Sequence, residues 1–250
     1  MKIVFIGNNR VGMEVLSWLV SEGEQICGLV VHPDDRARHK KEIVEVAGLP
    51  SEYIKEAPFL LTTGGAEWLR RMEPDLVLSV FFGYILPPEI IGIPGRGIIN
   101  LHPGLLPFNK GAYSNVWSII DETPAGATLH YIDEGIDTGD IISQQEVTVS
   151  PTDSGKTLYD RLEQACIDLF KSTWQSIRNG TAERRTQGSG GSEHRVRDVG
   201  QVDRIDPEKS YKAKDLINIL RARTFPPYKG AYIEIDGKKI YLALDLVEGD

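Results

Sequence analysis

The 250-residue chain has little cysteine and no long apolar run, and each shortage excludes a class of protein. Cys27 and Cys166 fall in a predicted strand and a predicted helix, so we expect two buried thiols rather than a disulfide or a catalytic thiol. No stretch approaches the ~20 apolar residues of a membrane span. The apolar start, residues 1–7, is too short for a signal peptide, and we expect a cytoplasmic protein without a membrane segment.

Positive charge is also in short supply. Lysine and arginine number 28 against 36 acidic residues, which gives a net charge of −8. This net negative charge disfavours electrostatic binding of a polyanion over an extended surface, so nucleic acid is not an expected partner. The histidines and cysteines do not fall at metal-ligand spacings, and no metal site is predicted.

The first half of the chain alternates apolar strand-like runs with helical patterns. Residues 2–7 and 25–32 are expected strands, and residues 11–21 between them have helical spacing. A further helix is expected over 36–48 and a buried strand over 75–80. This alternation predicts an α/β fold with a mostly parallel sheet.

The second half contains a long helix, a polar segment and a hairpin. We expect one amphipathic helix over 153–179 and a Gly/Ser-rich flexible connection soon after it. Asp236-Gly237 lies between two strand-like runs and predicts a β-hairpin, whose exposed edge suggests a homodimer through this subdomain. The expected organisation is a first domain over 1–185, a flexible connection over 186–200, and a small helix and β-hairpin subdomain over 201–250.

Three polar residues stand out against this framework. Asn100 and His102 lie two apart on a predicted strand that stops at Pro103, so their side chains share one face at its carboxyl end. Asp137 follows in a loop flanked by Gly135 and Gly139. An amide, an imidazole and a carboxylate that meet could carry acyl transfer.

This pattern resembles the folate-dependent formyltransferases. Their signature is an Asn-x-His on a strand, then Leu-Leu-Pro, a Gly, and later an Asp-x-Gly-x-Asp-Thr-Gly loop. The matching segments are residues 100–107, Gly111, Trp117, and residues 126–140. The resemblance covers roughly residues 1 to 180 and implies a Rossmann-like catalytic domain.

The chemistry of formyl transfer suggests a role for each of the three residues. His102 can take the proton from the attacking amine and return it to the leaving nitrogen. The Asn100 amide can donate to the oxyanion, and the Asp137 carboxylate can tune His102 by stabilising its protonated form. The alternatives are purely structural roles: a core histidine for His102 and turn residues for Asn100 and Asp137.

The resemblance also implies the formyl donor. In this family the donor is 10-formyltetrahydrofolate, and the pterin lies between the loop matching residues 82–87 and the aspartate loop. The implied cofactor contacts are Phe82, Tyr84, Leu86 and Ile132. Ordinary core packing is the alternative for each of them.

The amine acceptor is inferred from the end of the chain. Residues 201–250 are fewer than expected for the basic barrel of a tRNA-acting member, and a glycinamide ribonucleotide enzyme would normally stop near the connection. Arg221 to Tyr228, with its Phe-Pro turn, resembles the sugar N-formyltransferases, which implies a nucleoside-diphosphate-linked 4-amino-4,6-dideoxyhexose. The candidate acceptor contacts are Arg10, Lys110, Tyr113, Trp117, Phe225 and Tyr228.

Other functions stay open at this point. The alternatives are a methionyl-tRNA or glycinamide ribonucleotide formyltransferase, a formyltetrahydrofolate hydrolase and a silent folate-binding module. Trp117 has helical spacing to its neighbours and is equally consistent with core packing.

Overall fold

The computed structural model describes residues 1–249 and divides into two compact units. Unit 1 comprises Met1–His102, Thr128–Gln144 and Cys166–Gln187, and unit 2 comprises Pro103–Ala127, Gln145–Ala165 and the chain from Gly188 on. The units interleave along the chain, whereas the sequence suggested consecutive domains. The units interleave because two strands, over 125–131 and 141–147, and the long helix over 155–179 each pass from one unit into the other.

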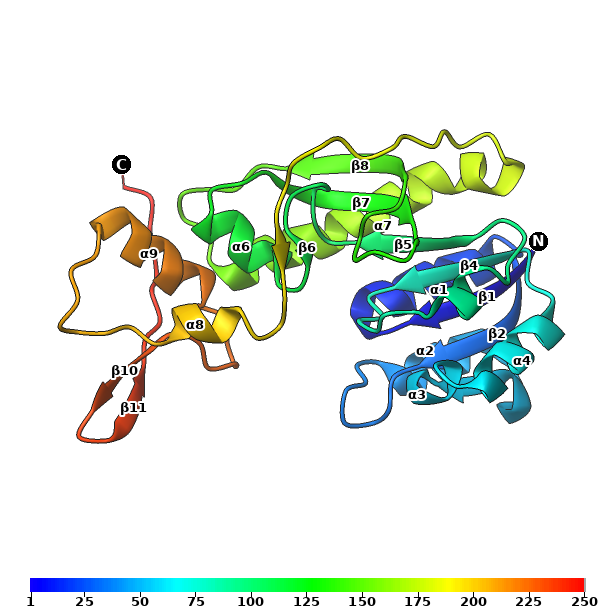
Figure 1. Cartoon of the computed structure of the whole chain (residues 1–250), viewed down its shortest axis with the longest axis horizontal. Helices are drawn as coiled ribbons and strands as arrows, with labels where there is room; N and C mark the ends of the chain where they lie inside the picture. Colours follow the sequence, from blue (N-terminus) through cyan, green and yellow to red (C-terminus); the bar gives the residue numbers. More distant parts are fainter. Residues whose placement is uncertain (250) are drawn as a thin grey trace. The chain divides into compact units, whose positions relative to one another are not determined.

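A seven-stranded sheet provides the framework (Figure 1). Its order is β3-β2-β1-β4-β5-β7-β8, with all pairings from β3 to β5 parallel and β5 antiparallel to β7. The strands are β1 Lys2–Gly7, β2 Gln25–Val31, β3 Ile54–Glu56, β4 Leu76–Val80, β5 Ile98–His102, β7 Ala125–Tyr131 and β8 Ile141–Val147. The predicted α/β fold with a mostly parallel sheet is confirmed.

The helices of unit 1 alternate with its strands, and α1 and α2 correspond to the two helices that the sequence predicted in this region. They are α1 Asn9–Ser21, α2 Lys40–Ala47, α3 Ala57–Leu60, α4 Thr63–Met72 and α5 Pro88–Ile91, with a 3-10 turn at Ser51–Tyr53. Helix α2 begins later than the expected residue 36, because His39 has a left-handed backbone with φ 56°. It ends at Ala47, and the following Gly48 has a φ of 60° that suits a residue without a Cβ.

The core of unit 1 is apolar on the strands themselves. Val4, Ile6, Val30 and Val77 are fully buried in one cluster with residues of α3 and α4. Such continuous apolar strands are typical of parallel sheets covered on both faces. The strand order reverses between β1 and β4, and ligands of open α/β sheets bind at the carboxyl ends beside such a reversal.

Unit 2 contains short helices and small strand pairs. Its elements are β6 Lys110–Gly111, α6 Ser114–Ile120, the first part of α7 Gly155–Asn179, β9 Glu193–His194, α8 Val199–Asp203, α9 Ala213–Ala222, β10 Tyr232–Ile235 and β11 Lys238–Tyr241. Asp236 and Gly237 both have positive φ, 49° and 73°, as a two-residue hairpin turn requires. The predicted hairpin is therefore confirmed.

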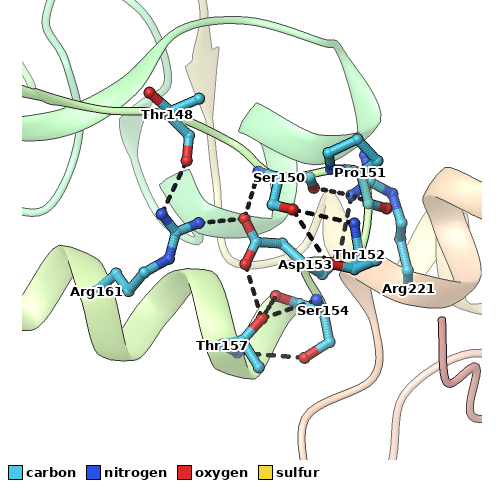
Figure 2. A network of polar contacts seen from close by, with 9 residues as sticks. All are labelled: Thr148, Ser150, Pro151, Thr152, Asp153, Ser154, Thr157, Arg161 and Arg221. Atoms are coloured by element: carbon cyan, nitrogen blue, oxygen red, sulfur yellow. Dashed lines mark hydrogen bonds and ion pairs between the residues drawn. The ribbon is translucent and has the colours of Figure 1, made fainter. Parts of the chain in front are cut away.

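A buried arginine fixes α9 within unit 2 (Figure 2). Nη1 of Arg221 donates to the carbonyls of Ser150, Pro151 and Asp153 at 3.0, 3.3 and 3.1 Å. Its Nε donates to Asn218 Oδ1 at 2.9 Å. Burial lowers the pKa of the Arg221 guanidinium, and the nearby charge of Asp153 opposes that shift. The guanidinium thus satisfies carbonyls that precede α7.

None of the helices within residues 1–249 combines the length and apolarity required to cross a bilayer.

Candidate functional site

The carboxyl end of β5 presents two polar side chains. Asn100 is half-buried and His102 is 5% exposed, and the intervening Leu101 is buried. Alternation along the strand places Asn100 and His102 on one face, as predicted. In the antiparallel pairing with β7, Asn100 lies opposite His130 and His102 lies opposite Thr128.

Hydrogen bonds and backbone conformations within the loop after β7 fix its conformation. Asp133 Oδ1 accepts from Gly135 N at 3.1 Å and from Thr138 Oγ1 at 2.6 Å. Asp137 adopts a left-handed backbone with φ 51°, which aspartate tolerates better than most residues. A Cβ at Gly139 would lie 1.9 Å from the carbonyl oxygen of Tyr131, so only glycine fits there.

The three residues singled out in the sequence meet at the Asp137 carboxylate. Its Oδ2 lies 3.4 Å from His102 Nδ1, and its Oδ1 lies 3.5 Å from Asn100 Nδ2. The side chains of His102 and Asp137 are 6% and 15% exposed. An amide donor, an imidazole and a carboxylate therefore share one mostly buried corner of unit 1, where electrostatic interactions are stronger than in water.

A fourth residue, His130, belongs to the same group and was not predicted. Its Nε2 lies 3.1 Å from Asn100 Nδ2 and 3.4 Å from Asp137 Oδ1. Its Nδ1 lies 2.8 Å from the carbonyl oxygen of Tyr131, which can only accept, so Nδ1 carries a proton. A neutral His130 accepts from Asn100, and a protonated one pairs with Asp137. The sequence analysis included His130 in a matching segment but gave it no role in the site, because the β5–β7 register is not visible in the sequence.

The residues predicted to contact the folate lie together in unit 1. Phe82 and Leu86 are buried, and the half-buried Tyr84 and Ile132 pack against the same apolar cluster. The rings of Phe82 and Tyr84 are 5.1 Å apart. Their role in folate binding stays a prediction.

His32 holds the segment that carries these aromatic residues, and this contact was also missed. Its Nε2 donates to the carbonyl oxygen of Phe82, and its Nδ1 accepts from Asn8 Nδ2 at 3.2 Å. Asn8 cannot reverse its amide, because its Oδ1 already accepts from Arg38 N at 2.8 Å. Burial lowers the pKa of the His32 imidazole. A neutral His32 therefore ties the end of β2 to the segment after β4.

The residues predicted to contact the acceptor are distributed over both units. In unit 1, Arg10 forms an ion pair with Glu14 at 2.9 Å. The other five lie in unit 2: Lys110 is half-buried, Tyr113 is 42% exposed, Trp117 is 7% exposed, Phe225 is half-buried and Tyr228 is 59% exposed.

Two aromatic contacts characterise the residues in unit 2. The Trp117 indole stacks on the His194 ring, with centroids 4.0 Å apart. The rings of Phe225 and Tyr228 are 5.7 Å apart. Acceptor binding by this set stays a prediction, and the burial of Trp117 is also what core packing requires.

No cluster of three or more His, Cys, Asp or Glu side chains suited to a metal occurs within the described part of the chain.

The geometry of the site agrees with a family match. Residues 1–172 match the family described as formyl transferase. The chain belongs to this family. Residues 198–248 of this formyl transferase match the family described as the N-formyltransferase dimerization C-terminal domain. The expected enzyme class is therefore confirmed: the chain is a folate-dependent N-formyltransferase.

Individual relatives of this formyl transferase differ in their acceptors. It is 32% identical to the methionyl-tRNA formyltransferase of Syntrophus aciditrophicus over 257 residues, which cover 96% of this chain and 78% of that protein. A 4-N formyltransferase from Francisella tularensis is 29% identical, with a TM-score of 0.86 over 99% of this chain and 98% of that one.

The formyltransferase PseJ from Anoxybacillus kamchatkensis is 31% identical and has a TM-score of 0.58. The match covers 80% of this chain and 89% of PseJ, whose structure holds UDP-4,6-dideoxy-4-formamido-L-AltNAc and tetrahydrofolate.

Proposed function

We propose that this formyl transferase moves a formyl group from 10-formyltetrahydrofolate to the amino group of a nucleoside-diphosphate-linked amino sugar, a 4-amino-4,6-dideoxyhexose. The observation that carries the proposal is the likeness to the Francisella tularensis 4-N formyltransferase over almost the whole of both chains. The folate half of the proposal is supported by the family and by PseJ, which was solved with tetrahydrofolate.

The residues around the Asp137 carboxylate suit this chemistry. The acceptor nitrogen forms a bond to the formyl carbon, and the bond from that carbon to the folate nitrogen breaks. His102 takes the proton from the attacking amine and returns it to the leaving nitrogen. The Asn100 amide donates to the formyl oxygen as negative charge develops there. Asp137, 3.4 Å from His102 Nδ1, stabilises the imidazolium between the two proton transfers.

The proposed folate contacts are Phe82, Tyr84, Leu86 and Ile132. They offer apolar surface for a flat ring, and two of them are half-buried rather than sealed in the core. Phe82, Tyr84 and Leu86 follow β4, which is parallel to β5 and ends at the same sheet edge, so they suit a ligand whose reactive carbon reaches Asn100 and His102. Ile132 follows the antiparallel β7 and is bonded to the backbone of Ile98, and it reaches the same apolar cluster from there.

A sugar acceptor agrees with the charge of the chain. The net charge is −8, and a protein that binds RNA through many phosphates normally presents an excess of lysine and arginine. A sugar nucleotide carries only a diphosphate, which a few cations can bind. We propose that Arg10, Lys110, Tyr113, Trp117, Phe225 and Tyr228 contribute contacts to this acceptor.

We also propose that the enzyme works as a homodimer. The family of residues 198–248 is described as a dimerization domain, and the β10–β11 hairpin lies within it. Ile235, Ile240 and Tyr241 on this hairpin are 51%, 45% and 42% exposed. Apolar side chains on an isolated two-stranded hairpin gain stability when a second copy covers them.

Methionyl-tRNA is the second candidate acceptor. It is favoured by the sequence relatives, which include methionyl-tRNA formyltransferases 28–32% identical to this chain. The two candidates share the donor, the reaction and the Asn100–His102–Asp137 site, and they differ in what surrounds the amine.

The test is a direct comparison of acceptors. Purified protein is incubated with 10-formyltetrahydrofolate and either a panel of UDP- and dTDP-linked 4-amino-4,6-dideoxyhexoses, methionyl-tRNA or glycinamide ribonucleotide. We expect a formylated sugar nucleotide by mass spectrometry, with tetrahydrofolate released in equal amount. Turnover of methionyl-tRNA alone would overturn the sugar proposal, and formate release without any acceptor would indicate a hydrolase.

A further inference from the structure

The segment that follows α7 in unit 1 is bonded to the strand and loop after Asp137. Arg185 and Ile141 exchange both backbone hydrogen bonds, at 2.9 and 2.7 Å, so the chain returns along β8 (Figure 1). The Arg184 guanidinium lies 3.7 Å from the centroid of the Tyr131 ring and 3.5 Å from Asp140 Oδ2. These contacts hold residues 184 and 185 beside the loop after β7, which contains Asp137.

Gln187 ends this segment and binds the loop itself. Its Nε2 donates to the carbonyl oxygen of Asp137 at 2.7 Å and to that of Gly139 at 2.8 Å. Two carbonyl oxygens can only accept, so the nitrogen of the amide must face them. Residue 187 had been expected to lie in a flexible connection over 186–200. In the structure, the side-chain amide of Gln187 bonds to the backbone at both ends of the segment from Asp137 to Gly139.

We infer that Gln187 is a positioning residue for formyl transfer, which acts by holding the Asp137 carboxylate against His102 and Asn100. The inference rests on the role proposed above for Asp137. Hydrogen bonding to Asp133 fixes the start of the loop, whereas Gln187 fixes the carbonyl of Asp137 itself.

The geometry makes the reaction sensitive to this restraint. The left-handed backbone of Asp137 is less favourable than an extended or helical one, and a released loop can relax from it. The carboxylate contacts with His102 and Asn100 are already 3.4 and 3.5 Å long, so a small displacement removes them. A misplacement of ~1 Å in a catalytic group can cost about 100-fold in rate.

The first test replaces Gln187 by methionine, which keeps the length of the side chain and removes both donated bonds. The buried Oε1 accepts no hydrogen bond from any residue among 1–249, so only the donor function is lost. We expect kcat to fall about 10- to 100-fold, with KM for folate and acceptor changed less than ~3-fold. An unchanged kcat contradicts the inference.

Arg185→Met is the matched control. Arg185 lies in the same segment and donates from its side chain to Gln144 Oε1 at 2.7 Å on the surface, while its backbone bonds to Ile141 do not depend on the side chain. We expect kcat within about 2-fold of the wild type for this variant. Thermal unfolding of both variants shows whether either has lost its fold.

A double-mutant cycle separates positioning from a general structural role. In an Asp137→Ala background the carboxylate is absent, so Gln187→Met should change kcat by less than ~2-fold. If Gln187 only supported the fold, its substitution would lower kcat by the same factor in both backgrounds. Equal factors would therefore overturn the inference.

The cycle is run on whichever acceptor the wild type formylates, so it does not depend on the identity of the acceptor. If no acceptor is formylated, the proposed function fails and the imidazole NMR signals of the free protein decide the inference. We expect the His102 and His130 ring nitrogens, both 3.4 Å from Asp137, to shift in Gln187→Met and not in Arg185→Met. Unshifted signals in Gln187→Met contradict the inference.

Discussion

Two mostly buried polar networks, one in each unit, differ in the partners of their central charged side chain. Around Arg221 in unit 2, one guanidinium nitrogen donates to three backbone carbonyls at 3.0–3.3 Å (Figure 2). Around Asp137 in unit 1, the contacts of the carboxylate with two histidines and an asparagine are 3.4–3.5 Å long. The contacts of the first group are short and mostly with backbone carbonyls, whereas those of the second are longer and are made between side chains.

The difference agrees with a structural role for the Arg221 network and with the catalytic role proposed for the group around Asp137. Carbonyl oxygens have no proton to exchange, so the Arg221 network has a single state that stabilises the packing of α9. An imidazole can gain and lose a proton near neutral pH, and hydrogen bonds in a catalytic site often tighten only when the substrate is present. The long contacts at Asp137 are therefore compatible with a site that changes protonation during a reaction.

Asp137→Asn is expected to have the largest effect of the substitutions that test this difference, and the effect is on kcat. The amide keeps the shape of the side chain but removes the charge that we propose stabilises the His102 imidazolium. We expect kcat to fall on the order of 1,000-fold, with the melting temperature nearly unchanged. Steady-state kinetics and a thermal unfolding curve measure the two quantities. A variant with wild-type kcat would show that the carboxylate does not serve the reaction.

For Arg221→Met we expect the opposite result, a loss of stability with kcat nearly unchanged. Methionine fills much of the volume but leaves the carbonyls of Ser150, Pro151 and Asp153 without this donor, so we expect the free energy of unfolding to fall by about 3 kcal/mol. Urea denaturation measures the loss. Ile217→Met, an exposed position on the same helix, is the control and should change stability by less than ~0.5 kcal/mol. A lower kcat in a folded Arg221→Met variant would contradict a purely structural role for the Arg221 network.

The smallest effect is expected at His32 and concerns pH. Because burial lowers the pKa of His32 in the folded state, the unfolded chain binds this proton more readily. The stability that His32 contributes is complete above the unfolded pKa of ~6.5 and falls as the pH drops below it. Nearby Arg36 adds to the lowering of the pKa, whereas Asp35 opposes it.

His32→Gln isolates this contribution. Glutamine can donate to the carbonyl of Phe82 and accept from Asn8 without titrating, so we expect a loss below ~1 kcal/mol at pH 8. The free energy of unfolding of the variant should fall less between pH 7 and pH 5 than that of the wild type. Denaturant unfolding at several pH values makes the comparison, and parallel curves would contradict the role given to His32.

The sequence was sufficient for the features that depend on local pattern. The alternation of apolar runs predicted the α/β fold, Asp236-Gly237 predicted the hairpin, and the two-residue spacing of Asn100 and His102 predicted their common face. Their meeting with Asp137 could be predicted only because a motif in fixed order supplemented the pattern. Helix ends were less accurate, since the left-handed backbone of His39 makes α2 begin at Lys40 and not at residue 36.

Three residues near the site needed the tertiary structure. His130 reaches Asp137 because β7 runs antiparallel to β5 in one particular register. His32 reaches Phe82 because β2 and β4 flank β1. Gln187 was assigned to a flexible connection because glycine and serine follow it, yet it binds a loop 50 residues away in the chain.

The sequence by itself therefore determined which elements form and which chemical groups the chain offers, because periodicity and turn preference act between near neighbours. The tertiary structure decided which of those groups share the Asp137 carboxylate and which merely hold the fold. Hydrogen bonds select partners by distance in space, and strand order and register set that distance.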